Sequence, residues 1–239
     1  MALAGKAALA MWWDIAPQVR ADFEHWHAHE HFPERLAIPG FLRASRWRSA
    51  DGGDGMFVLY ELAGHEVLGS PAYLARLNAP TPWSTRLMPH HRNMVRSQCH
   101  VLESRGGVTA CCALTVRLAP AAGREADLQR TLRRLTESTP FRPGIAGLHL
   151  LRHEVPPIAA TTEQLLRGLA DEAAAWVIVA SGYDRGALAD LAAAELGAPS
   201  LLDMGAAPGA TVGLFDLAYA AIGSDVAGIS LPAAAGPTT

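Results

Sequence analysis

The residues that could carry chemistry are concentrated in one short segment. Four of the ten histidines fall within residues 25–31, with the sequence HWHAHEH. An imidazole titrates near neutral pH, and a neighbouring carboxylate can tune its pKa, so this combination suits proton transfer. Residues 19–36 follow a helical pattern, and helical geometry therefore decides which of these side chains point inward.

Glu30 falls on the stripe of the predicted helix that otherwise contains Phe23 and Trp26, at about 100° per residue. A carboxylate in an apolar stripe must be paired, hydrogen-bonded or exposed to a cavity. In one interpretation, the segment is a polar helix end in which Glu30 pairs with Arg35 or Arg43.

His27 and His31 flank the same stripe, whereas His25 and His29 point away from it. We therefore interpret His27, His31 and Glu30 as an acid–base site between the helix and a sheet. Tyr60 lies on a predicted central strand and is expected to present its hydroxyl to this site, or else to be a core aromatic.

A metal site is the alternative for the same histidines. His27 and His31 are four residues apart, which is a ligand spacing found on helices. Glu30, His90 or His91 would complete the set around a divalent metal.

Four further side chains are candidates for substrate binding. Trp26 and Trp47 would wall an apolar cleft. Arg46 alternates with Trp47, so that one of them faces the interior, where an arginine could hold a carboxylate; alternatively Arg46 is exposed on an edge strand. His90 follows a proline-rich link and would lie at the pocket mouth or in a solvated loop.

The elements that must position these residues occur in the order β-α-β-β-α-β, twice. Strands are predicted over 7–15, 41–48, 56–62 and 93–102, then over 109–118, 148–154, 176–181 and 211–219. Helices are predicted over 19–36 and 65–78, with a break at Pro71, then over 125–137 and 185–196. Pro39-Gly40 aligns with Pro143-Gly144, which indicates a diverged duplication.

The predicted fold is α+β, with two tandem ferredoxin-like βαββαβ units. Helices cover one face of each sheet, so the other faces pack together as an α/β barrel within one chain. Residues 1–105 form the first unit, which carries the His/Glu site. Residues 106–229 form the second unit, which is mainly structural and has an insertion at 156–173. Residues 230–239 are expected to be a disordered tail.

The composition of the chain argues against several classes of protein. The chain is 50% hydrophobic and 18% charged, with a net charge of −3, so nucleic acid is not an expected partner. No apolar run reaches the roughly 18 residues of a membrane span, and the start of the chain does not resemble a signal peptide. Three cysteines, two of them adjacent, do not make a disulfide framework. We expect a cytoplasmic protein that binds a small molecule, with a homodimer as the candidate assembly.

One stretch carries a family resemblance. The segment DFEHWHAHEHFPER at 22–35, with IPGF at 38–41 and then Arg46, resembles the dimeric α/β-barrel superfamily, especially its EthD-like and uncharacterised relatives. There a Trp precedes a His-x-Pro and a Pro-Gly-hydrophobic turn, and His31 matches the motif histidine. The resemblance implies a ligand between sheet and helices. It also implies the chemistry of cofactor-free monooxygenases, isomerases, dehydratases, lyases or haem enzymes.

The predicted function is a cofactor-free lyase, isomerase or dehydratase that acts by proton transfer on a small aromatic or polyketide-like substrate. His31 or His27 would be the general base or acid, Glu30 would orient the imidazole, and Tyr60 would assist. The alternatives are a metal- or haem-dependent enzyme that uses the same histidines, and a binding protein without catalysis.

Overall fold

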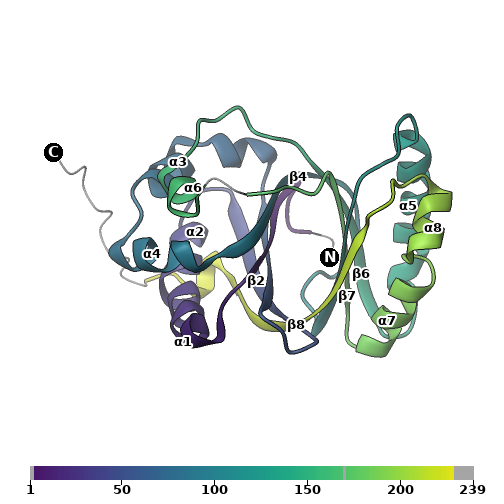
Figure 1. Ribbon diagram of the computed structural model, residues 1–239, viewed down its shortest axis with the longest axis horizontal. Coiled ribbons are helices and arrows are strands. Elements are labelled where there is room, and N and C mark those ends of the chain that lie inside the picture. The colour runs from purple at the N-terminus through teal and green to yellow at the C-terminus, as the bar shows by residue number, and fades with distance from the viewer. Residues whose placement is uncertain (1–2, 169–170, 229–239) are drawn as a thin grey trace.

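The computed structural model describes residues 3–168 and 171–228, and the predicted tail at 230–239 lies outside them. Eight strands form a closed barrel in the order β1-β3-β2-β8-β5-β7-β6-β4. Every neighbouring pair is antiparallel. Helices pack against the outside of this barrel on two opposite sides (Figure 1). No helix among the described residues has the length and apolar composition to cross a membrane.

The first unit contains the predicted strands and helices in the predicted order. Its strands are β1 (Ala7–Asp14), β2 (Phe41–Ser49), β3 (Gly55–Leu62) and β4 (Arg92–Gly106). Its first helical segment comprises α1 (Pro17–Trp26), a π-helical turn (His27–His31) and α2 (Phe32–Leu36). The second comprises a 3₁₀ turn (His65–Gly69) and α3 (Pro71–Asn78), so the predicted break at Pro71 is confirmed.

The second unit repeats this arrangement with β5 (Cys112–Leu118), α5 (Glu125–Ser138), β6 (Ile145–His153), β7 (Trp176–Gly182), α7 (Arg185–Ala193), α8 (Ala198–Met204) and β8 (Thr211–Ile222). Its sheet order β8-β5-β7-β6 corresponds to β4-β1-β3-β2 in the first unit. The units join where β2 pairs with β8 and β4 pairs with β6. The predicted tandem ferredoxin-like fold is therefore confirmed.

The duplication is visible at the two Pro-Gly turns. Gly40 and Gly144 have φ of +96° and +85°, a region that favours glycine. The carbonyl of Gly40 accepts from the Ala63 N–H at 2.9 Å, and the carbonyl of Gly144 accepts from the Tyr183 N–H at 2.9 Å. Equivalent glycines thus start equivalent strands in both units.

Three short helices were not predicted. They are α4 (Pro82–Leu87) in the proline-rich link, α6 (Thr162–Leu166) in the insertion, and α8. Pro82 of that link occupies the first turn of α4, and Pro199 lies in the first turn of α8, a position where the missing N–H of proline breaks no helical hydrogen bond. Thr161 and Gln164 form a capping box that starts α6.

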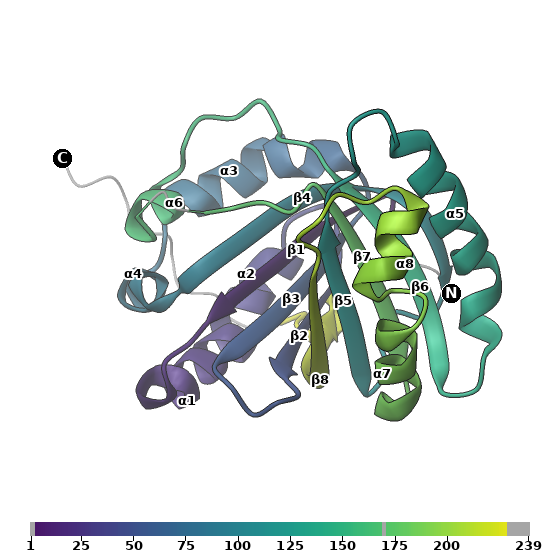
Figure 2. The same ribbon diagram turned by 45° about the vertical axis from the view of Figure 1, so that its right-hand side comes forward.

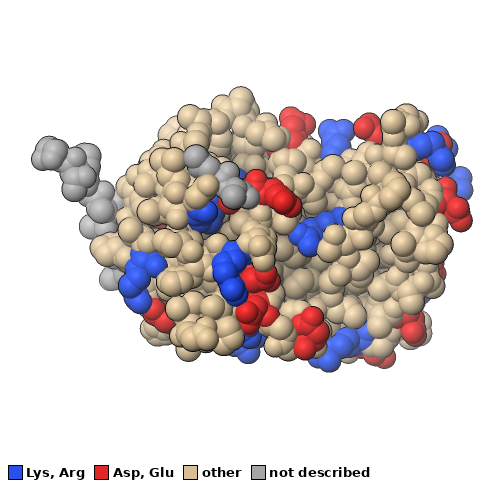
Figure 3. All heavy atoms as spheres, viewed as in Figure 1, with Lys and Arg blue, Asp and Glu red and all other residues tan. Residues whose placement is uncertain are grey.

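The barrel interior is filled with side chains. Trp12, Trp47, Phe57 and Phe215 belong to this buried cluster, whereas Trp13 belongs to the cluster between the first sheet and its helices. The space between the first sheet and its helices lies outside this packed interior. On the face seen in Figure 3, charged groups of both signs are interspersed.

Candidate functional site

The predicted helix over 19–36 is continuous, but its middle is a π-helical turn. The N–H of Phe32 donates to the carbonyl of His27, an i to i+5 bond. Such turns insert a residue and are frequent at functional sites. This one spans His27 to His31, the histidine-rich part of the segment.

His27 and His31 point inward and are 1% and 6% exposed, whereas His25 and His29 are exposed, as predicted. The rings of His27 and His31 stack with centroids 5.2 Å apart. Neither Nδ1 has a hydrogen-bond partner among the described residues. Two buried imidazoles thus keep polar atoms that no protein group satisfies.

Burial makes both imidazoles neutral. It lowers the pKa of His27 well below its ordinary 6.5, and the nearby guanidinium of Arg46 acts in the same direction. Burial lowers the pKa of His31 in the same way, with the Arg35 guanidinium as the next cause. Both rings therefore retain a lone pair at pH 7 and can accept a proton from a bound molecule.

The two rings line a small cavity of about 30 Å³ between the sheet and the helices. Tyr60 lines it too, and its hydroxyl has no partner among the described residues. Burial raises the pKa of Tyr60 well above 10.0, so the hydroxyl stays protonated and can donate. A cavity of this size holds one or two waters, at about 10–15 Å³ each, so an organic substrate requires it to widen.

Glu30 is buried, as its place on the stripe predicted, but it makes no hydrogen bond to either imidazole. Its carboxylate accepts from Trp26 Nε1 at 3.0 Å, from Ser84 Oγ at 3.4 Å and from Thr81 Oγ1. Arg35 does not pair with it. The carboxylate joins the helix to the start of α4, so the expected orientation of an imidazole by Glu30 has no counterpart in the structure.

Arg35 places a cation beside the histidines and is held by a residue from the other unit. Its buried guanidinium lines the cavity, forms an ion pair with Glu163 of α6, and also contacts Glu34 at 3.4 Å. The insertion that contains α6 crosses from the second unit to lie beside α3 and α4 (Figure 2). The second unit, expected to be mainly structural, therefore covers the cavity of the first.

The predicted substrate-binding residues lie elsewhere. Trp26 packs on His31, with ring centroids 4.5 Å apart, but does not line the cavity. Trp47 faces the barrel interior, on the opposite side of the sheet, and donates to Ser45 Oγ at 3.1 Å. Arg46 is buried rather than exposed, and it donates to the Glu24 carbonyl at 3.0 Å.

His90 is exposed, and the adjacent His91 is the residue that reaches the cavity. Burial lowers the pKa of His91 to about 3. His91, Met94 and Arg167 line both the small cavity and a groove of about 550 Å³ outside it. The cavity and the groove therefore adjoin at these three side chains.

The donor set does not fit a bound metal. Among the described residues, no group of three His, Cys, Asp or Glu side chains is placed to hold one. A haem, like an organic substrate, would require the cavity of about 30 Å³ to widen.

The fold and the site define a dimeric α/β-barrel architecture in which one chain supplies both ferredoxin-like units. No family model and no curated protein matches the sequence. Solved structures do match. An anthrone oxidase-like protein is 10% identical, with a TM-score of 0.63 over 97% of this chain and 99% of that one.

Two proposed monooxygenases are also similar. That of Fusobacterium nucleatum is 9% identical, with a TM-score of 0.60 over 92% of this chain and 95% of that one. That of Lactobacillus acidophilus is 8% identical, with a TM-score of 0.55 over 92% and 97%. At sequence identities this low, the structural similarity shows a shared fold alone.

Proposed function

We propose that the cavity is the active site of a small-molecule enzyme that begins its reaction by removing a proton from the substrate. The observation that carries this proposal is the pair of neutral, buried imidazoles, His27 and His31, whose Nδ1 atoms have no partner among the described residues. A buried polar atom without a partner is costly in free energy, and acid–base function is a reason to retain it.

The surrounding groups suit the anion that proton removal creates. His27 or His31 would take a proton from an acidic C–H or a phenolic O–H. The guanidinium of Arg35 and the hydroxyl of Tyr60 line the same cavity and would stabilise the resulting enolate or phenolate. Glu30 would contribute indirectly, by fixing the position of the helix that carries both histidines.

An enolate or phenolate can isomerise, eliminate a leaving group, or react with molecular oxygen. The names of the similar structures, an anthrone oxidase-like protein and proposed monooxygenases, favour the oxygen branch. We therefore place cofactor-free oxidation of a small aromatic substrate ahead of the lyase, isomerase and dehydratase reactions. Membership among the EthD-like proteins and homodimerisation remain predictions.

Anthrone is the probe for a direct test. Oxygen uptake with the purified protein in air, compared with buffer alone, measures the oxidation. Exchange of the acidic anthrone protons in deuterated buffer without oxygen measures the proton transfer separately. We expect both to be accelerated; exchange without uptake would indicate an isomerase or lyase. If neither rate rises with anthrone or with simple phenols, the proposal is wrong.

A further inference from the structure

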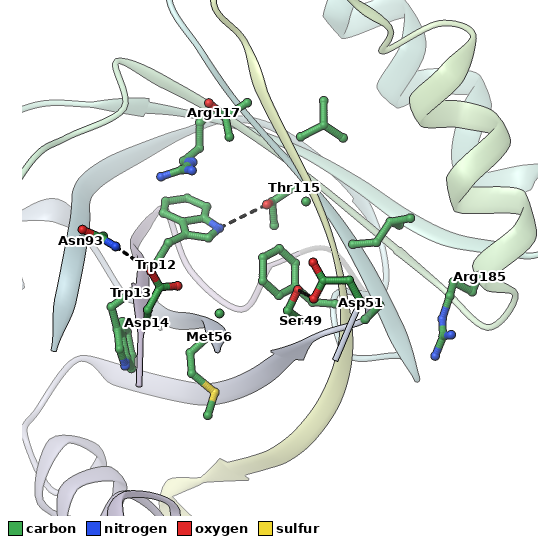
Figure 4. A pocket seen from close by; sticks show the side chains of 17 residues that line it. Trp12, Trp13, Asp14, Ser49, Asp51, Met56, Asn93, Thr115, Arg117 and Arg185 are labelled. Atoms are coloured by element: carbon green, nitrogen blue, oxygen red, sulfur yellow. Dashed lines mark hydrogen bonds between the residues drawn. The ribbon is translucent and has the colours of Figure 1, made fainter. Parts of the chain in front are cut away.

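A second and larger hollow lies at the open end of the barrel, on the opposite side of the sheet from the histidines. It has a volume of about 520 Å³ and receives side chains from both units, among them Trp12, Asp14, Thr115, Arg117 and Phe215 (Figure 4). Ligand pockets occupy about 300–1,000 Å³. The hollow is thus large enough for a small organic molecule in the structure as it stands.

Arg117 stands out among the charged groups there. Its side chain is half-buried, and it forms no hydrogen bond or ion pair with any residue that the structure describes. Burial lowers the pKa of Arg117, although Glu172 and Asp14 act in the opposite direction. A guanidinium carries five donors, so a partly desolvated one without a partner is a ready site for an anion.

The other charged side chains of the hollow already have partners. Asp14 accepts from Asn93 Nδ2 at 2.7 Å. Asp51 accepts from Ser49 Oγ at 2.7 Å.

Arg185 is bound to Asp216 at 2.6 Å and lies apart from Arg117 (Figure 4). Asn93 and Ser49 are neutral donors, so Asp14 and Asp51 keep their negative charges, and Arg117 is the cation of the hollow that has no hydrogen-bonded or ion-paired partner among the described residues.

Aromatic side chains form the wall beside this cation. The Arg117 guanidinium lies 5.3 Å from the centroid of the Trp12 ring. Trp12 is fixed by a hydrogen bond from its Nε1 to Thr115 Oγ1 at 3.1 Å and by stacking on Phe57 at 5.1 Å. The ring of Phe215 lines the same hollow. A flat apolar ligand with an acidic group at one end matches this combination.

We propose that the open end of the barrel binds a small aromatic carboxylate, with the carboxylate on Arg117 and the ring against Trp12 and Phe215. The arginine fork matches the two carboxylate oxygens, and the indole and phenyl rings match the apolar body of the ligand. This site is distinct from the cavity at His27 and His31, although Trp13 lines both and Arg117 also lines the groove outside that cavity.

Isothermal titration calorimetry with 2-naphthoate tests the proposal. We expect saturable binding to the wild-type protein, and an affinity at least about tenfold lower for 2-naphthamide, which has no charge. Arg117→Met should lower the affinity for 2-naphthoate by about tenfold or more. Arg134→Met, at an exposed arginine of α5, is the matched control and should change nothing.

Two further variants locate the ligand. Arg117→Lys keeps the charge without the fork, and it should weaken binding about threefold or more if Arg117→Met does not fold. His27→Gln should leave the affinity unchanged, which separates this site from the cavity between sheet and helices. The proposal is overturned if 2-naphthoate does not bind, if both Arg117 variants bind it like wild type, or if His27→Gln abolishes binding.

Discussion

His27 and His31 lie with their rings stacked at an interplanar angle of 28°, one π-helical turn apart. Both rings face the same small cavity, where Tyr60 and Arg35 also lie. The pair therefore offers two neutral bases to one bound molecule.

Replacing either histidine should reduce turnover. We expect His27→Gln or His31→Gln to lower kcat for an accepted substrate by about 10²-fold or more, because general-base catalysis contributes about 10²–10⁴. His25→Gln, on the exposed face of α1, is the control and should retain the wild-type rate. A double His27→Gln/His31→Gln variant that turns over like wild type would refute the acid–base assignment.

Stability should fall when the pH drops below about 6.5. The folded protein keeps His27 and His31 neutral, because burial holds their pKa values well below 6.5, whereas the unfolded chain takes up protons near 6.5. The unfolded state therefore binds more protons below that pH, and the free energy of unfolding decreases by up to about 1.4 kcal/mol per pH unit for each histidine. Urea unfolding between pH 7.5 and 5.5 measures this slope.

The His27→Phe variant tests whether His27 causes this pH dependence of the free energy of unfolding. Phenylalanine cannot titrate, so the slope below about pH 6.5 should become shallower by up to about 1.4 kcal/mol per pH unit. Equal slopes in wild type and His27→Phe would show that this imidazole titrates normally.

The buried ion pair between Arg35 and Glu163 should contribute to stability more than a surface pair does. Both side chains are almost fully buried. Glu163→Gln removes the negative charge that compensates the buried guanidinium of Arg35. We expect a loss of about 1–3 kcal/mol in the free energy of unfolding. Glu195→Gln disrupts the more exposed pair with Arg142 and should cost less than about 1 kcal/mol. Equal losses would contradict the role of Glu163 in fixing the insertion.

Metal content separates the remaining alternatives for the histidine pair. We expect elemental analysis of the purified protein to show no stoichiometric metal, because His27 and His31 have no third ligand grouped with them among the described residues. Native mass spectrometry of the same sample tests separately for haem, which needs only one histidine ligand. One metal ion or one haem per chain would replace the acid–base proposal with a ligand role for these histidines.

The fold was predictable because strand and helix periods are local properties of the sequence. Short apolar segments bounded by turn residues placed the eight strands, and the repeated order of elements with the paired Pro-Gly turns indicated the duplication. The burial of His27, Glu30 and His31 also followed from helical geometry.

The hydrogen-bond and ion-pair partners of the residues on this helix could not be predicted from local sequence patterns. Glu30 binds Thr81 and Ser84, which are separated from it by two strands and a helix in sequence. Arg35 meets Glu163 across 128 positions. The capping box at Thr161 was the local signal that the insertion contains a helix, but nothing local shows where that helix packs.

The insertion that carries α6 affects how the sequence of this protein can diverge. In a dimer of identical chains every substitution appears twice, so a segment that improves one half is imposed on the other. Here the helix that carries His27 and His31 and the segment that covers their cavity belong to different halves of one chain. The halves are thus free to specialise, one in the histidine-bearing helix and the other in the segment that covers it.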